Sequence, residues 1–348
     1  MELFFREKTA SGLTDAEIRE ALVESLAGNK PKKVLLVPPD FTRFHSNAGF
    51  ITNTYYHLLE CTCQVDILPA LGTHVPMTEA ELDEMYGDIP HDRFIVHNWR
   101  QDVLTVGEVP ASYLFSITEG LWNEPVRLEV NRLIMDDSYD LIISIGQVVP
   151  HEVIGMANHA KNLFVGCGGT ETINKSHMIG AVFGMERMMG KDHTPVRKIF
   201  DYGMEHFLNR RPILFALTVT TAPKGMIRTH GLFIGDKRSV LEQAVRLSQE
   251  KNINFLNEPV EKCVVYLDPK EYKSTWLGNK AIYRTRMAMK DGGELIVLAP
   301  GVNKFGEDPK IDLLIRKYGY CGRLKVLDLY KNNDDLKQSL ATAAHLIH

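Results

Sequence analysis

The sequence predicts an α/β fold of two domains, in which mostly parallel sheets are flanked by helices and the active-site cleft lies between the domains. Short apolar runs of strand length recur along the chain and alternate with segments of helix length. Several of these runs end in turns marked by proline or glycine, such as Pro38, Pro39 and Gly72. Strands that alternate with helices in this way are typical of a mostly parallel sheet.

The expected elements follow from the local pattern. Thr78 suits the N-cap of a helix over residues 79–86, because acidic residues fill the first turn and Gly87 stops the helix. The other expected helices are 53–59, 239–250, 280–290, 310–318 and 334–346, with a turn at 291–293. The expected strands, all short and mostly apolar, are 34–37, 65–70, 94–99, 139–145, 215–223, 263–267 and 294–301.

A domain boundary is expected near Asn257, Glu258 and Pro259, because the alternation of strands and helices starts again after this point. We therefore predict a cofactor-binding and catalytic α/β domain over residues 1–258 and a smaller α/β domain over residues 259–348.

Composition argues against several classes of protein. The chain has 348 residues, of which 44% are hydrophobic, and its net charge of -4 leaves no basic surface for nucleic acid. Five scattered cysteines do not suggest a disulfide framework, so a cytoplasmic location is expected. The N-terminus lacks the apolar core of a signal peptide, and no apolar run approaches the roughly 18 residues of a membrane span. The sequence leaves the oligomeric state open.

The most informative stretch runs from Pro150 to His177. His151 is followed ten residues later by Lys161, and His177 comes sixteen residues after that lysine. The apolar run 141–145 precedes the stretch and predicts a buried strand. Such a strand delivers His151 just beyond its C-terminal end, where open α/β sheets place their ligands.

Two earlier turns carry polar side chains that suit the same edge of a sheet. Asp40, Thr42 and Arg43 follow the first expected strand, and an arginine in a strand-to-helix turn suits a phosphate. His74 follows the second expected strand, and the ordinary pKa of histidine suits a general base at neutral pH. The glycine motifs of dinucleotide-binding folds and of P-loops are absent from the sequence.

Other polar candidates carry weaker signals. His151, His159 and His177 are candidate metal ligands, although their spacing matches no zinc motif, and a packing role accounts for His159 equally well. Gly168 and Gly169 belong to a glycine cluster that permits close approach of the backbone to an anion, or forms a flexible turn.

Taken together, these motifs resemble lactate racemase and the wider family of 2-hydroxyacid racemases and epimerases that depend on a nickel-pincer nucleotide. The resemblance covers most of the chain in the family's order. Its parts are Asp40-Phe41-Thr42-Arg43, Gly72-Thr73-His74, the pair Pro150-His151 followed by Lys161 and His177, and Lys280 twelve residues before Gly292. Each match is weak by itself, but four in order with the family's spacing form a specific pattern.

The resemblance implies a cofactor and the residues that hold it. Lys161 would be attached through a thioamide to a doubly thiolated pyridinium mononucleotide, the pincer, which cofactor-synthesis enzymes must supply. His177 would be the protein's ligand to nickel, for which imidazole is a suitable donor. The expected cofactor contacts are Asp40, Thr42, Arg43, Gly168 and Gly169.

The resemblance also implies that His74 and His151 stand on opposite sides of the substrate carbon. One histidine would take the hydroxyl proton while hydride passes to the pincer and a 2-keto acid forms. The hydride would then return to the other face, with a proton from the other histidine. Inversion in both directions needs two bases, and a closed cleft keeps water from the hydride. The expected enzyme is a nickel-dependent isomerase.

Departures from the family's pattern bear on the substrate, which is a small 2-hydroxy acid in the family. Lactate racemases usually have Gly-Gly-Arg before the cofactor lysine, where this chain has Asn158-His159-Ala160. Val75 replaces a frequent arginine after the histidine of the Gly-Thr-His turn. Because buried polar contacts discriminate strongly between substrates, these changes argue against lactate itself.

The second domain departs in a similar way. Trp276 and Leu277 replace a polar pair ahead of Lys280. The expected substrate contacts are Lys280, Trp276 and His159, and the expected substrate is a sugar acid or another longer hydroxyacid. The chain ends at His348, before the family's usual end, so the second domain is expected to lack a final strand and helix.

Three alternatives stay open at this point. The first is a zinc-type metal-dependent hydrolase built around His74, His151 and His177. The second is a homologue that binds the cofactor or a sugar acid without turnover, against which both histidines count. The third is an NAD oxidoreductase, against which the missing glycine fingerprint counts.

Overall fold

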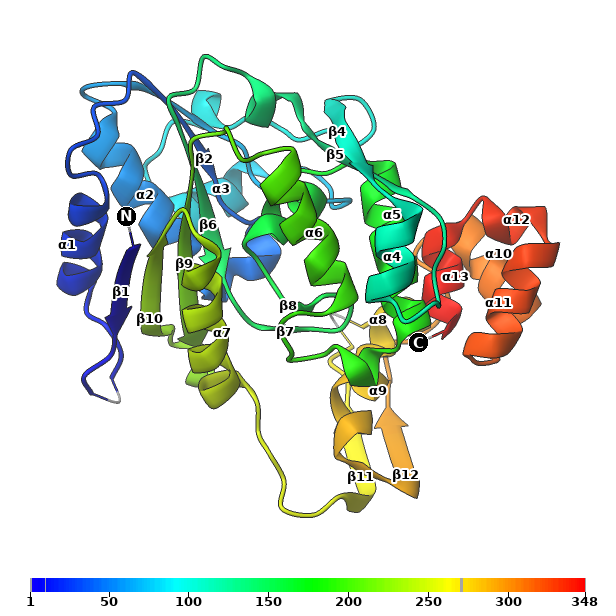
Figure 1. The fold of residues 1–348 in the computed structure, drawn as a ribbon. Coiled ribbons are helices and arrows are strands. Elements are labelled where there is room, and N and C mark those ends of the chain that lie inside the picture. Colours follow the sequence, from blue (N-terminus) through cyan, green and yellow to red (C-terminus); the bar gives the residue numbers. More distant parts are fainter. Residues whose placement is uncertain (1, 10, 270–271, 348) are drawn as a thin grey trace.

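The centre of the computed structural model is a six-stranded sheet with the strand order β1-β10-β9-β6-β2-β3. The structure describes residues 2–9, 11–269 and 272–347. Strands β9, β6, β2 and β3 run parallel to one another, whereas β10 is antiparallel to both β9 and β1. Figure 1 shows helices packed around this sheet, with β11 and β12 projecting below it. The predicted α/β class and the mostly parallel sheet are confirmed.

The bounds of the elements are as follows. The strands are β1 (Glu2–Arg6), β2 (Lys33–Val37), β3 (Gln64–Ile67), β4 (Val103–Val109), β5 (Val126–Asn131), β6 (Leu141–Gln147), β7 (Pro150–His151), β8 (Gly155–Met156), β9 (Ile213–Thr221), β10 (Arg228–Gly235), β11 (Val260–Tyr266) and β12 (Met289–Leu298). The α-helices are α1 (Asp15–Ser25), α2 (Ala48–Leu59), α3 (Glu79–Tyr86), α4 (Ala111–Ile117), α5 (Thr170–Phe183), α6 (Pro195–His206), α7 (Arg238–Asn252), α8 (Thr275–Gly278), α9 (Lys280–Thr285), α10 (Pro309–Tyr318), α11 (Arg323–Asn332), α12 (Asp334–Lys337) and α13 (Leu340–Ile347).

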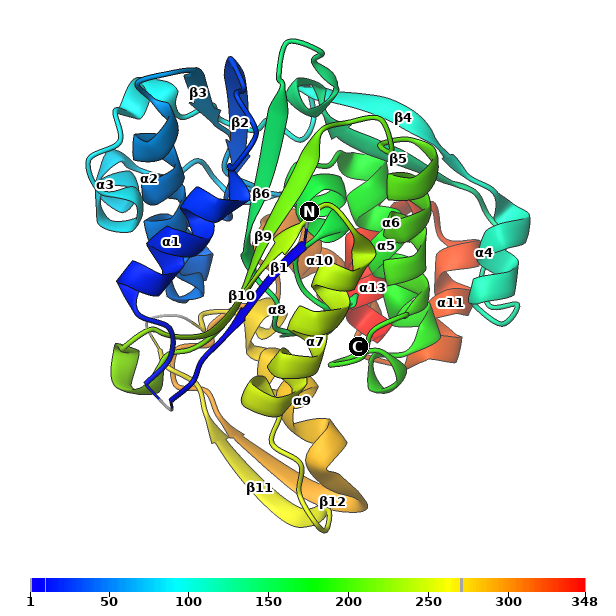
Figure 2. The same cartoon turned by 60° about the vertical axis from the view of Figure 1, so that its left-hand side comes forward.

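Helices cover both faces of the central sheet, and the alternation of side chains along each strand assigns them to two cores. In β2, Leu35 and Val37 face the core under α5, α6 and α7, whereas Val34 and Leu36 face the core under α1, α2 and α3. Figure 2 shows these two helical layers on opposite sides of the sheet. Because both faces are covered, the central strands read as continuous apolar runs rather than as alternating ones.

Capping chemistry fixes where two of the outer helices begin. The backbone N–H of Glu81 donates to the hydroxyl of Thr78, and the Glu81 carboxylate accepts from the backbone N–H of Thr78. This capping box confirms the predicted start of α3. Thr14 and Glu17 form the same box at the start of α1, a helix that the sequence analysis did not identify.

The structure differs from the predicted elements where pairing overrides the local pattern. Residues 94–99 do not form a strand, and only Phe94 makes a β-bridge, to Ile67. Of the predicted helix over 280–290, the α-helix ends at Thr285, a 3-10 turn follows over Arg286–Ala288, and β12 begins at Met289.

Two further differences lie in the C-terminal segment. The predicted turn at 291–293 is a bulge within β12, where the pairing partner shifts between Val260 and Lys262 of β11. The predicted helix over 334–346 is divided into α12 and α13.

The C-terminal segment does not pack as one compact unit. β11 and β12 form a two-stranded parallel sheet. By contrast, Ala343, Ala344 and Leu346 of α13 belong to the same apolar core as α5 and α6. The connection over residues 253–259 contains neither helix nor strand, and the division at Glu258 stays a prediction.

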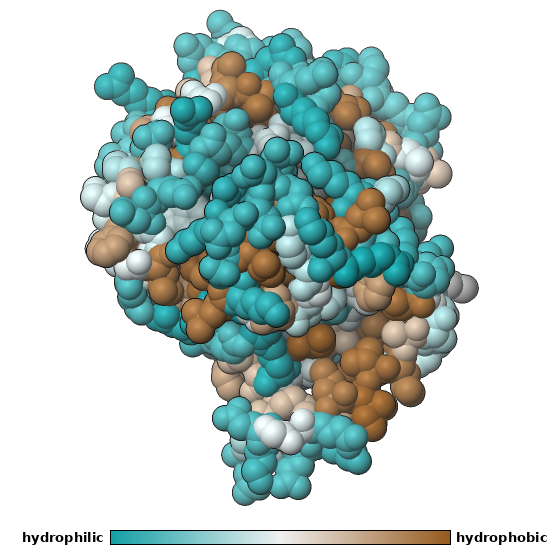
Figure 3. Space-filling view, turned by 90° about the vertical axis from the view of Figure 1, so that its right-hand side faces the viewer, coloured by the Kyte–Doolittle hydropathy of each residue, from teal (hydrophilic) through white to brown (hydrophobic). Residues whose placement is uncertain are grey.

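The two-stranded sheet leaves much of its apolar surface in contact with solvent. Val264, Tyr266 and Leu298 are among its exposed large side chains. Figure 3 shows the side of the molecule that lies on the right in Figure 1, and apolar residues gather in its lower part, above a polar tip.

No helix in the described ranges is both long and apolar enough to cross a membrane.

We expect the backbone amides of β11 and β12 to exchange with solvent at least about tenfold faster than those of β6, because an exposed two-stranded sheet buries little apolar surface. Hydrogen–deuterium exchange of the intact chain, read by mass spectrometry on peptides from residues 260–266, 289–298 and 141–147, measures the difference. Equal protection in all three segments would contradict this expectation.

Candidate active site

A cavity of about 200 Å³ opens at the C-terminal edge of the parallel strands. It lies where the loops after β2, β3 and β6 meet, on both sides of the point at which the strand order reverses. Open α/β sheets bind ligands at such switch points. The lining residues are Pro39, Asp40, Thr42, Arg43, Ala70, Leu71, Gly72, Thr73, His74, Gln147, His151, Ala157, Asn158, Lys161, Asn162, Val165, Gly166, Ile173 and His177.

Asp40 and His74 form a hydrogen-bonded pair between the loops after β2 and β3. Asp40 Oδ2 lies 2.6 Å from His74 Nδ1, and the Thr42 hydroxyl donates to the other carboxylate oxygen at 2.6 Å. Burial opposes ionisation of Asp40, but the bonds from His74 and Thr42 and the charge of Arg43 outweigh burial and lower its pKa. An ionised Asp40 requires a proton on His74 Nδ1, which leaves Nε2 unprotonated in the neutral ring.

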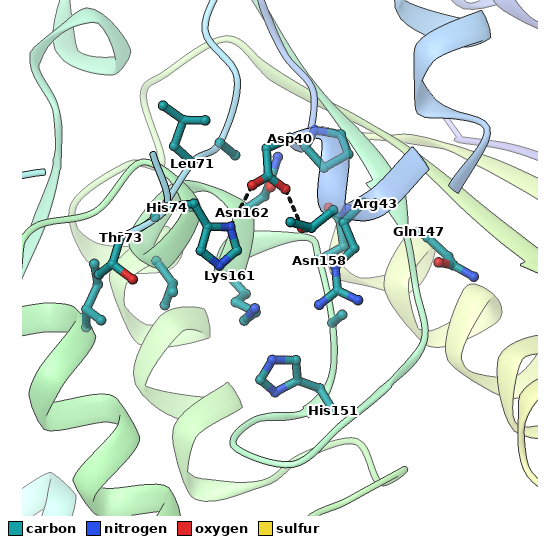
Figure 4. Close-up of a pocket in the computed structure, with 18 of the residues that line it drawn as sticks. Asp40, Arg43, Leu71, Thr73, His74, Gln147, His151, Asn158, Lys161 and Asn162 are labelled. Atoms are coloured by element: carbon teal, nitrogen blue, oxygen red, sulfur yellow. Dashed lines mark hydrogen bonds and ion pairs between the residues drawn. The ribbon is translucent and has the colours of Figure 1, made fainter. Parts of the chain in front are cut away.

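His151 lies across the cavity in the opposite hydrogen-bonding state. The backbone N–H of Val153 donates to His151 Nδ1 at 3.1 Å, so the proton of the neutral ring is on Nε2. Burial, followed by the charge of Lys161, lowers the pKa of His151 well below its ordinary value. His74 therefore presents an acceptor and His151 a donor. Figure 4 shows both rings facing the space that also holds Lys161 and Arg43.

Lys161 enters the cavity at the start of a π-helix, Asn162–Gly166. The Asn162 side chain ties this start to the sheet, because its Nδ2 donates to Val37 O at 2.9 Å and to Ser144 Oγ at 3.0 Å. Withdrawal from water, followed by the charge of Arg43, lowers the pKa of Lys161 to about 8. About a tenth of the amine is therefore uncharged at pH 7, far more than for a lysine with its ordinary pKa near 10.4, and the uncharged amine is the nucleophilic form.

His177 reaches the same cavity from α5. Its Nδ1 donates to Ile173 O, one turn earlier, at 2.7 Å, so Nε2 keeps a free lone pair. Burial lowers the pKa of His177, which favours this neutral form. Glu129 of β5 positions the helix, because its carboxylate accepts from the backbone N–H of Glu171 at 2.9 Å.

The loop that carries His74 is held against the π-helix by backbone contacts. Gly72 N–H donates to Gly166 O at 2.7 Å. A Cβ on Gly166 would lie 2.6 Å from the Cβ of Ala70, so any side chain here would force the two loops apart.

The structure brings seven of the twelve predicted site residues together in the cavity lining: Asp40, Thr42, Arg43, His74, His151, Lys161 and His177. The other five do not line the cavity. Gly168 O accepts a hydrogen bond from His97 Nε2, and a Cβ on Gly169, which starts α5, would meet the Glu129 carboxylate at 2.3 Å. Both glycines are buried in protein contacts rather than open to the cavity.

His159 lies in the core, where its ring stacks on Phe215 with 3.8 Å between centroids. This position gives no support to its predicted substrate contact. Trp276 packs against His345, and Lys280 is outside the lining as well. The charge of Lys280 nevertheless acts on Glu152, which places α9 near the loop that carries His151.

Two of the lining residues that the sequence did not single out carry amide side chains. Gln147 is the last residue of β6, and Asn162 directly follows Lys161. The position of Gln147 at the C-terminal end of a predicted parallel strand was the available signal. By contrast, no pattern indicated that Asn162 connects two strands, because those contacts span more than a hundred residues of chain in one case.

The geometry supports neither a nucleophilic thiol at Cys167 nor the zinc-dependent hydrolase that was one of the alternatives. Cys167 is fully buried, and burial raises the pKa of its thiol, which disfavours a nucleophilic thiolate. Within the described ranges, no three His, Cys, Asp or Glu side chains are gathered as a metal-binding group.

Comparisons with known proteins agree with this fold. The chain is similar to a structural-genomics protein from Thermotoga maritima, with 27% identity, a TM-score of 0.84, and coverage of 99% of this chain and 83% of that one. It also resembles the lactate racemase apoprotein from Thermoanaerobacterium thermosaccharolyticum, with 16% identity, a TM-score of 0.71, and coverage of 97% and 79%. At that identity the second likeness shows the fold alone. No curated protein matches the sequence.

The family of the lactate racemase N-terminal domain matches residues 13–189, which is just over half of the chain. The matched region contains every residue that lines the cavity. On this evidence the chain belongs to the lactate racemase family, as a divergent member.

Proposed function

We propose that this protein is a racemase or epimerase that inverts the carbinol carbon of a 2-hydroxy acid. One observation carries the proposal: His74 and His151, which come from the ends of different strands, face one cavity together with Lys161 and His177. Their hydrogen bonds leave one ring as an acceptor and the other as a donor. Inversion requires such a pair, because one proton must leave the substrate and another must be delivered.

The residues present fit the nickel-pincer nucleotide that the family resemblance implies. The cavity offers Lys161 an environment that lowers its pKa to about 8, as an attachment amine needs. His177 Nε2 has a free lone pair, and its Nδ1–H is fixed on a carbonyl, the arrangement common among metal-binding histidines. When bound, the cofactor supplies the two-electron chemistry at the carbinol carbon.

The remaining steps belong to the chain itself. His74 Nε2 accepts the hydroxyl proton of the substrate, while the ionised Asp40 stabilises the resulting imidazolium through Nδ1. His151 Nε2–H donates a proton on the other side. Arg43 and, until the cofactor is attached, Lys161 make the cavity electropositive, which favours anionic groups such as carboxylates and phosphates.

The substrate we propose is a sugar acid or another hydroxyacid longer than lactate. Asn158 and Gln147 both line the cavity and supply amide groups that can bind additional hydroxyls. Asn158 stands where lactate racemases usually have glycine, so it is the more specific of the two. His159, by contrast, is turned into the core.

Protein produced together with the cofactor-synthesis enzymes is expected to carry a mass increment on Lys161 and close to one equivalent of nickel. The variant Lys161→Ala is expected to lose both, because it lacks the attachment amine. Intact-mass spectrometry and elemental analysis measure the two quantities, and Lys191→Ala, an exposed lysine, is the matched control. An unmodified wild-type mass, under conditions that load a known lactate racemase, would contradict the assignment.

The variants His74→Gln and His151→Gln are each expected to lower the inversion rate by about 10²-fold or more, because each removes one proton-transfer group. The Lys161 mass increment should persist in both. Polarimetry or chiral chromatography on a panel of lactate and sugar acids measures the rates. Wild-type rates in either variant would refute the two-histidine assignment, and faster inversion of lactate than of every sugar acid would refute the substrate proposal.

Asp40→Asn is expected to lower the rate by about 10²-fold or more while the ring of His74 stays in place. An asparagine amide donates to Nδ1 and so favours the tautomer whose Nε2 is protonated and cannot act as a base. The rate and the Nδ1 and Nε2 chemical shifts of ¹⁵N-labelled His74 report the two effects. Full activity with the proton still on Nδ1 would show that the Asp40 charge is not needed.

A further inference from the structure

Two adjacent residues, separated from Lys161 only by Ala160, adopt an uncommon backbone conformation. Asn158 and His159 have φ angles of 67° and 58°, in the left-handed region that disfavours residues with a Cβ. Two such residues in succession turn the chain sharply just before the lysine. Single left-handed asparagines occur in many turns, but an adjacent pair persists only where the surroundings fix it.

One buried side chain holds the backbone on the near side of this turn. Arg197 of α6 is only 1% exposed, and its Nη2 donates to Met156 O at 2.7 Å and to Asn158 O at 3.1 Å. Both carbonyls accept from the one Nη2 atom, which lies one bond further from Cα than the Nζ of a lysine, so the shorter lysine side chain would reach them less well. Among the hydrogen bonds of the described residues, the second of these two bonds is the one that ties the Asn158 carbonyl to another element.

The neighbouring backbone is held by the same part of the fold. The hydroxyl of Thr194, the N-cap of α6, donates to Ile154 O at 2.6 Å, and Gly190 N–H donates to Gly155 O at 2.8 Å. A Cβ on Gly155 would lie 2.2 Å from Lys191 O, so the two segments are in direct backbone contact. The segment before Lys161 is therefore packed on a fixed support.

Arg197 is in turn held by charge within the core. Arg238 of α7 binds Asp192 through Nη1 and Nη2 at 2.9 and 2.6 Å, and binds Asp201 through Nε at 3.1 Å. Asp201 compensates the charge of Arg197 without a direct bond, and both Arg197 Nη1 and Asp201 Oδ1 are buried without a partner. Retaining an incompletely paired arginine in the core is costly, which points to a role beyond packing.

On the far side of the turn, Lys161 is tied down by its successor. Asn162 N–H donates to His159 O at 2.8 Å, and the Asn162 side chain binds the end of β2 and the middle of β6. The turn is thus clamped at both ends, by Arg197 before it and by Asn162 after it. Figure 4 shows Asn158 and Lys161 directed toward the same space.

We propose that Arg197 is a positioning residue, which acts through the carbonyls of Met156 and Asn158 to hold the left-handed turn that aims Lys161 into the cavity. Without this clamp, the turn relaxes toward ordinary backbone angles, and the lysine amine moves out of the cavity toward water. The inference rests on the proposed function only in giving Lys161 a role, because the geometry itself concerns the chain alone.

The variants Arg197→Lys and Arg197→Met test the clamp. The lysine variant keeps the buried charge on a shorter side chain that falls short of the two carbonyls, and the methionine variant removes charge and donors together. Lys198→Met, at the next position of α6, is the matched control. Competitive labelling of the cofactor-free protein with acetic anhydride across pH, read by peptide mass spectrometry, gives the labelling midpoint of Lys161. Near-ultraviolet circular dichroism verifies folding.

In the wild type and in Lys198→Met, the midpoint is expected near pH 8, because the cavity lowers the pKa of Lys161 to about 8. In both Arg197 variants it should rise by about one unit or more toward the ordinary value for lysine, near 10.4. Loss of stability alone would not move this midpoint in protein that remains folded.

Three outcomes would overturn the proposal. The first is a wild-type midpoint in both folded variants. The second is a rise in Arg197→Met alone, which would trace to lost charge rather than to the lost bridge. The third is failure of both variants to fold while Lys198→Met folds, which would make Arg197 a structural residue. Because the labelling uses protein without cofactor, its result stands whether or not Lys161 gains the mass increment that tests the proposed function.

Discussion

The site depends on one physical constraint, the placement of a lysine amine that is withdrawn from water beside an arginine that stays exposed. Loss of hydration, followed by the charge of Arg43, lowers the pKa of Lys161, and burial, with a smaller effect from the charge of Lys161, lowers the pKa of His151 and His177. The same positive charges attract anions. A single electrostatic arrangement therefore yields a reactive amine, neutral imidazoles and an affinity for carboxylate or phosphate groups.

Asp40 supplies a negative charge that balances these positive groups. It lies beside the positive groups, remains ionised despite burial, and fixes the tautomer of His74. Its own loop is held in place by Tyr86, whose hydroxyl donates to Pro39 O. Tyr86 is the last residue of α3, the helix that begins at the Thr78 capping box. The start of this helix therefore helps to place the Asp40 loop at the candidate site.

The left-handed turn before Lys161 is formed by two residues that carry a Cβ. Where lactate racemases usually have two glycines, which adopt positive φ freely, this chain has Asn158 and His159 at a cost of about 1–2 kcal/mol each. Part of that cost is offset locally, because Asn158 Oδ1 accepts from His159 N–H at 2.7 Å and the His159 ring stacks on Phe215. As a result, the amide side chain of Asn158 lines the cavity.

The C-terminal segment is connected to the rest of the chain through α13, whose Ala343, Ala344 and Leu346 share an apolar core with α5 and α6. Aromatic and polar contacts hold the elements of the segment to one another. His345 of α13 lies against Trp276, and Tyr320 OH lies 3.0 Å from His345 Nε2. Because α13 also packs on α5, which carries His177, the elements around Lys280 are linked to the candidate metal ligand through one helix. The exposed sheet of β11 and β12 is the least supported part of this arrangement.

The sequence by itself determined the α/β class, the central strands and the start of α3, because apolar runs and capping residues are local signals. It also predicted Asp40, His74, His151, Lys161 and His177 as site residues, and the structure places all five in the lining of one cavity. The family resemblance carried most of that identification. Only the tertiary structure decided that His159 faces Phe215, that residues 291–293 form a bulge, and that Asn162 and Arg197 hold the turn around Lys161. Those outcomes depend on contacts between residues far apart in the chain, and strand pairing and packing density, rather than local propensity, set such contacts.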